Sequence, residues 1–94
     1  MDELEATISE LLSRELAGSE VRFDPYPGYG KLHGAIIWDG FAESEQLERQ
    51  HRVWDVLRPA LSEEQRFATG FLLTVTPDEW NAVANEWTAM VAAN

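Results

Sequence analysis

The chain has 94 residues, which is enough for one domain with a modest hydrophobic core. Its 17 acidic and 7 basic residues give a formal net charge of −10, which argues against non-specific binding to nucleic acid or to an anionic membrane. The absence of cysteine excludes disulfides, thiolate metal sites and cysteine nucleophiles. We find neither a secretory signal nor an apolar run of about 18 residues, so we expect a soluble cytoplasmic protein.

The first predicted helix spans residues 2–17. Asp2 is its expected N-cap, and Gly18 can take the positive φ that ends a helix. Five apolar side chains recur along one stripe at helical spacing: Leu4, Ile8, Leu11, Leu12 and Leu16. We expect this stripe to pack against the core.

Two strands are predicted next, over residues 19–24 and 32–38, and the short connection between them favours an antiparallel pair. Proline and glycine dominate the connection at residues 25–31, which predicts a loop. Its GYGK segment lacks the length and the Ser/Thr of a phosphate-binding loop, and it precedes a strand rather than a helix. Tyr26, Tyr29 and Lys31 are therefore candidates for contact with a partner.

A buried strand, a turn and an amphipathic helix form the predicted centre of the fold over residues 34–57. Asp39 and Gly40 provide the turn. The helix is expected to begin at Ser44 as N-cap and to end near Arg58, because Pro59 cannot continue it. A short turn of helix is expected to follow from Ser62.

Residues 67–75 predict the third strand. Thr76 as N-cap, Pro77 at the first position and Glu79 at the third then form a capping box that starts a last helix. This helix places five side chains on one face: Trp80, Val83, Ala84, Trp87 and Val91. The order of elements predicts an α+β fold, a two-layer αββαβα sandwich with a three-stranded sheet and helices packed on one face.

The basic residues concentrate on and after the central helix, where two interpretations remain open. Arg49 and Arg52 each follow a glutamate by four residues, so a solvated face of Glu45–Arg49 and Glu48–Arg52 ion pairs is one. A surface for an anionic or acidic partner is the other.

The two histidines are expected to have ordinary structural roles. His51 stands four residues before Asp55, which favours an ion pair, although a ligand or partner contact is the alternative. His33 lies within a predicted strand, as a surface or hydrogen-bonded side chain. Two histidines without cysteine predict no structural metal site. We also find no nucleophile with a matching base, so no enzymatic activity is predicted.

Two segments, residues 36–57 and 72–80, together resemble the BolA-like family. The resemblance is carried by Asp39 and Phe41 after a strand and by the RQHR segment at residues 49–52 with the aromatic Trp54 behind it. It continues in the TVTPDEW segment at residues 74–80. The resemblance implies a class II KH-like fold and a partner role with monothiol glutaredoxins in iron–sulfur handling or stress regulation.

The family's two cluster ligands are missing from this sequence. The resemblance aligns its histidine at the start of the third strand with Ala68, and the loop at residues 25–31 holds neither cysteine nor histidine. We therefore expect no metal and no cofactor.

These observations predict a non-enzymatic BolA-like protein-interaction module. Its expected partner-binding residues lie on the central helix and on the loop before the second strand: Arg49, His51, Arg52, Tyr26, Tyr29 and Lys31. Two alternatives are a nucleic-acid-binding transcriptional regulator, which the KH-like fold suggests, and a family member that only self-associates.

Overall fold

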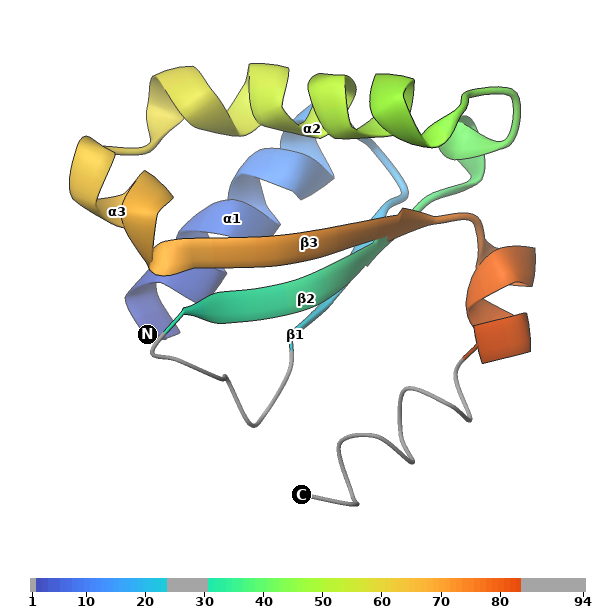
Figure 1. Cartoon of the computed structure of the whole chain (residues 1–94), viewed down its shortest axis with the longest axis horizontal. Coiled ribbons are helices and arrows are strands. Elements are labelled where there is room, and N and C mark those ends of the chain that lie inside the picture. The colour runs from blue at the N-terminus through green and yellow to red at the C-terminus, as the bar shows by residue number, and fades with distance from the viewer. Residues whose placement is uncertain (1, 24–30, 84–94) are drawn as a thin grey trace.

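The computed structural model describes residues 2–23 and 31–83 of the chain. The element order is α1 (Asp2–Glu15), β1 (Glu20–Phe23), β2 (Leu32–Ile37), a 3₁₀ turn η2 (Asp39–Phe41), α2 (Gln46–Ala60), α3 (Glu63–Ala68) and β3 (Thr69–Val75). Residues 77–83 are again helical. The α+β class predicted from the sequence is confirmed (Figure 1).

The three strands form one mixed sheet in the order β1-β2-β3. β1 runs antiparallel to β2, with Val21 opposite Ile36, as predicted. β2 runs parallel to β3, with Ile36 opposite Thr74. Such a parallel pair needs a long crossover, which η2, α2 and α3 provide here (Figure 1).

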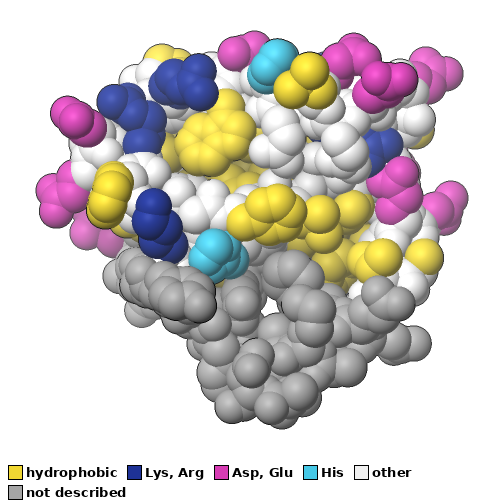
Figure 2. All heavy atoms as spheres, viewed as in Figure 1, with side chains coloured by type: hydrophobic (Ala, Val, Ile, Leu, Met, Phe, Trp, Pro, Cys, Tyr) yellow, Lys and Arg dark blue, Asp and Glu magenta, His cyan; other side chains and the backbone are white. Residues whose placement is uncertain are grey.

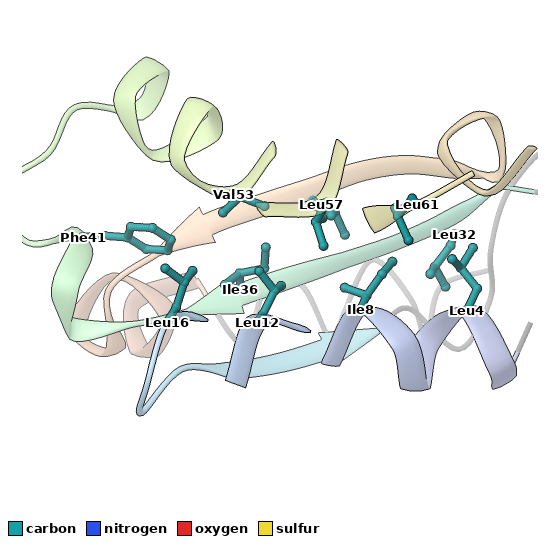
Figure 3. Packing of buried hydrophobic residues seen from close by; sticks show 11 residues of the cluster. Leu4, Ile8, Leu12, Leu16, Leu32, Ile36, Phe41, Val53, Leu57 and Leu61 are labelled. Atoms are coloured by element: carbon teal, nitrogen blue, oxygen red, sulfur yellow. The ribbon is translucent and has the colours of Figure 1, made fainter. Parts of the chain in front are cut away.

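The core lies between the two long helices and the sheet. Figure 3 shows the apolar side chains of α1 facing those of α2, with Leu32 and Ile36 of β2 beside them. Ile8, Ile36 and Leu57 have no exposed surface, and burial of each such side chain stabilises the fold by about 1.5–3 kcal/mol. The predicted stripe on α1 is confirmed at four positions, while Leu11 is only partly buried.

The observed ends of α1 and α2 differ in how well the sequence predicted them. Gly18 follows α1 with φ of 90°, as expected for a residue that ends a helix. At α2, however, the predicted N-cap Ser44 is wrong. Glu45 occupies that position without a side-chain cap, and the Ser44 carbonyl instead accepts a bond of 2.9 Å from Nε of Arg49.

Pro59 does not stop α2, which continues to Ala60. A proline in the last turn removes only the hydrogen bond that its own nitrogen would donate. The helical bonding continues past the proline, since the N–H of Leu61 donates to the carbonyl of Leu57 at 2.9 Å. The predicted end near Arg58 is therefore two residues short of the observed end at Ala60.

The predicted capping box at Thr76 is present, and a second one stands at Ser62, where a turn of helix was predicted to start. Ser62 and Gln65 exchange bonds of 2.9 and 3.1 Å at the start of α3, and Thr76 and Glu79 exchange bonds of 2.8 and 3.2 Å. The box at Ser62 starts a longer helix than expected, so Phe67 belongs to α3 and the third strand begins at Thr69 rather than at residue 67.

Candidate functional site

Polar side chains of α2 bind the outer edge of β3. Gln50 donates from Nε2 to the carbonyl of Leu72 at 2.8 Å, and Gln46 donates from Nε2 to the carbonyl of Thr74 at 3.0 Å. The hydroxyl of Thr74, a residue with no exposed surface, donates in turn to Gln46 at 2.8 Å. This cluster joins α2 to β3.

Arg49 is the charged member of the same cluster. Arg49 is only 5 % exposed, and its Nη1 donates to the carbonyl of Thr74 at 3.2 Å. Nη1 and Nη2 lie 2.7 and 3.3 Å from the two carboxylate oxygens of Glu79. The hydrogen bonds from Arg49 and from the Thr76 backbone hold the pKa of the Glu79 carboxyl below its ordinary value.

The burial of Arg49 corrects the prediction of an exposed basic face on the central helix. Among the described residues, the ion pairs are Arg49–Glu79 and Arg22–Glu20. The expected Glu45–Arg49, Glu48–Arg52 and His51–Asp55 pairs are therefore wrong. Local spacing along one helix suggested them, whereas the carboxylate that Arg49 selects lies 30 residues further along the chain.

Arg52 lies against an aromatic side chain rather than beside an acid. Its guanidinium carbon lies 4.8 Å from the ring centroid of Trp38. Trp38 is itself fixed, because its Nε1–H donates to the carbonyl of Ala17 at 3.0 Å and its ring packs edge-on against Phe41. His51 is exposed on α2. Arg52 and His51 thus lie on α2 but do not form a basic cluster with Arg49.

The two exposed phenylalanines of the described chain lie elsewhere, one on each side of the junction between α3 and β3. Phe67 is 74 % exposed and Phe71 is 55 % exposed. The Nζ of Lys31 lies 4.4 Å from the centroid of the Phe67 ring, a cation–π distance. Figure 2 shows hydrophobic, basic and histidine side chains together on the face of the molecule where β3 lies, with acidic side chains around its margin.

His33 connects this surface to the sheet. Its Nδ1 accepts a bond of 2.9 Å from the N–H of Phe71, which places the proton of the neutral ring on Nε2. The ring covers Gly70 so closely that a Cβ there would lie 2.5 Å from Cε1 of His33. The predicted role of His33 as a hydrogen-bonded strand residue is confirmed. We name Lys31, His33, Phe67, Gly70 and Phe71 the α3–β3 patch.

Sequence reasoning found only part of this patch. Lys31 was predicted as a binding residue and belongs to it, whereas Tyr26 and Tyr29 lie outside the described residues. The two phenylalanines were missed because they alternate with small residues, as in a strand that faces the core. The capping box at Ser62 was the signal that could have placed Phe67 on a helix instead.

Two kinds of feature were not found in the described part of the chain, a cluster of metal-ligating side chains and a membrane-spanning helix. Across residues 2–23 and 31–83, no three histidine, aspartate or glutamate side chains are arranged to hold a metal ion. None of the helices in these ranges has the length and apolar character needed to cross a membrane. Its exposed aromatic side chains make the α3–β3 patch the best candidate for a functional site.

Comparison with known proteins adds no relative, since no family model and no curated protein matches the chain.

Proposed function

We propose that this chain is a cytoplasmic, non-enzymatic protein-binding domain that docks a protein partner through the α3–β3 patch. The observation that carries the proposal is the exposure of two large aromatic side chains, Phe67 near the end of α3 and Phe71 on β3. Water is an unfavourable environment for two large aromatic side chains, and burial of each against a partner is worth about 1.5–3 kcal/mol.

The patch is also held in shape before a partner arrives. His33 fixes the backbone of Phe71 through a bond of 2.9 Å, and Lys31 packs over the ring of Phe67. A surface that is already ordered loses little conformational entropy on binding. Aromatic anchors on a rigid support are typical of the residues that dominate binding energy in protein interfaces.

The chemistry of the patch defines the partner that fits it. Lys31 supplies a positive charge and His33 an Nε2–H donor at the margin of an apolar surface. A matching partner presents an apolar pocket bordered by carboxylates or carbonyl oxygens. The resemblance to BolA-like proteins suggests a monothiol glutaredoxin, and with it a role in iron–sulfur handling or stress regulation.

A titration monitored by NMR tests this proposal. The ¹⁵N-labelled chain is titrated with an unlabelled monothiol glutaredoxin, once without and once with its iron–sulfur cluster. We expect amide shifts at residues 31–33 and 67–71, and none at Leu47, which is 68 % exposed but lies in the first turn of α2. Unchanged patch resonances with both forms would refute the proposal.

Nucleic-acid binding is the second candidate, because exposed phenylalanines beside a lysine can stack on unpaired bases. The net charge of −10 opposes it. If it were correct, single-stranded DNA or RNA would shift the same amides at low salt, and the affinity would fall steeply as salt is added. The partner protein is expected to bind with a much weaker salt dependence.

A further inference from the structure

The two edge strands of the sheet, β1 and β3, differ in whether side chains bind their outer backbone groups. The edge of β3 is closed by α2, whose side chains Gln46, Arg49 and Gln50 donate to the carbonyls of Leu72 and Thr74. Among the described residues, no side chain bonds to the backbone of β1 in this way. An open strand edge presents unpaired N–H and C=O groups that another strand can bind.

The backbone direction of β1 follows from its neighbours. The N–H of Trp38 donates to Val75 on β3, so the alternate residues Ala35 and Ile37 direct their backbone groups toward β1. Their partners on β1 are Arg22 and Glu20. The backbone N–H and C=O of Val21 and Phe23 therefore point away from β2, to the edge at which no described residue bonds to them.

We propose that β1 pairs with β1 of a second copy of this chain, antiparallel and centred on Val21. A two-fold axis beside Val21 lets the N–H of each Val21 donate to the carbonyl of the other. The same register places Glu20 of one copy directly opposite Arg22 of the other, twice. A surface that matches itself in this way is the requirement for a symmetric dimer.

The charges on β1 select both the partner and the register. Glu20 and Arg22 lie on the same face of the strand, with side chains 54 % and 56 % exposed, and they already pair within one copy at 2.7 Å. In the dimer the four groups alternate in sign, so every neighbouring charge is opposite. Opposite charges across a strand pair are favourable and like charges are unfavourable.

This dimer is independent of the proposed protein-binding function. The α3–β3 patch takes residues from β2, α3 and β3, and β3 lies at the other edge of the sheet from β1. Each dimer would form a continuous six-stranded sheet and keep both patches free. Because the contact is a single pair of four-residue strands, it belongs to the class of small, weak interfaces.

Charge exchange on β1 tests the proposal. Sedimentation equilibrium over a dilution series up to millimolar protein, near physiological ionic strength, measures dimerisation of the wild-type chain. Glu20→Arg places Arg opposite Arg, and Arg22→Glu places Glu opposite Glu, so each single variant should dimerise about tenfold more weakly. The double variant, and an equimolar mixture of the two single variants, should regain wild-type affinity because both restore opposite pairs.

Glu48→Arg and Arg58→Glu are matched controls, since both residues are exposed on α2 and the changes alter net charge by the same amounts. The dimerisation constants of both controls should stay close to that of the wild type, because a change in net charge alone does not alter the pairing on β1. A wild-type chain that stays monomeric at millimolar concentration would overturn the proposal. So would a mixture of the single variants that associates no better than either variant alone.

Discussion

Arg49 is a charged side chain that stabilises the interior of this fold. It is almost completely buried, and it is bound on three sides by the Ser44 carbonyl, the Thr74 carbonyl and the Glu79 carboxylate. Each hydrogen bond to a charged group typically contributes about 1.5–3 kcal/mol. Arg49 thus fixes the start of α2, the end of β3 and the start of the last helix relative to one another.

Glu79→Gln should lower the free energy of unfolding by about 1–2 kcal/mol, because it removes the charge that pairs with Arg49 while Glu79 is half exposed to water. Urea unfolding at neutral pH measures the change. Asp55→Asn is the control, since Asp55 is exposed on α2 and forms no ion pair in the described structure; it should unfold as the wild type does.

The same pair predicts a pH dependence. The pKa of Glu79 is lowered in the folded chain, so its contribution to stability is complete above the ordinary carboxyl pKa and is lost as the pH falls through the lowered value. The difference in stability between the wild type and Glu79→Gln should therefore shrink on acidification. A difference that stays constant from neutral to acidic pH would contradict the assignment.

Gly70 is required because of the side chain that packs on it, His33, and not because of its backbone conformation. A methyl group at this position would approach His33 to 2.5 Å, so the imidazole ring must move and release the N–H of Phe71. Gly70→Ala should cost about 1–3 kcal/mol in stability. The ¹⁵N shifts of the His33 ring show which nitrogen carries the proton. If the variant keeps both the Nε2–H signal and the stability of the wild type, the ring accommodates the methyl group and the prediction is wrong.

At the scale of elements, capping residues decide where α3 begins. Ser62→Ala should cost about 1 kcal/mol, because it exposes the N–H of Gln65 that the serine hydroxyl now binds. Thermal unfolding checks this, with Ser13→Ala as the comparison, since Ser13 lies exposed inside α1 and caps nothing. Equal losses in both variants would contradict the role of the capping box.

The same scale explains which boundaries the sequence could predict. Side-chain to backbone bonds over three residues, as at Ser62 and Thr76, are local and are readable from spacing. The start of α2 is different, because Ser44 could cap a helix locally but its carbonyl is bound by Arg49 in an arrangement that also involves β3. Tertiary contacts of this kind override a local preference and leave no trace in spacing.

At the scale of the whole molecule, the sequence predicted the fold class better than the site. The apolar stripe on α1 recurs at helical spacing and β2 is a short, nearly continuous apolar run, so the layer arrangement followed from them. Whether Phe67 and Phe71 face the core or the solvent depends on where α3 ends and on how β3 packs. An exposed phenylalanine and a buried one look identical in a sequence.

We propose two surfaces through which the molecule associates. The α3–β3 patch would offer aromatic anchors to a protein partner, while the edge of β1 would offer backbone groups and paired charges to a second copy. They lie on opposite edges of the sheet, so both can be occupied at once. A dimer would present two patches and bind a multivalent partner more tightly than one copy does.

The most direct test of the central claim compares two serine substitutions of exposed hydrophobic residues. Calorimetric titration with a monothiol glutaredoxin gives the Kd for the wild type, Phe71→Ser and Leu47→Ser, with circular dichroism to verify folding. We predict that Phe71→Ser weakens binding at least about tenfold, as loss of an aromatic anchor does, while Leu47→Ser binds like the wild type. Equal affinity of all three proteins would contradict the assignment of the α3–β3 patch as the docking surface.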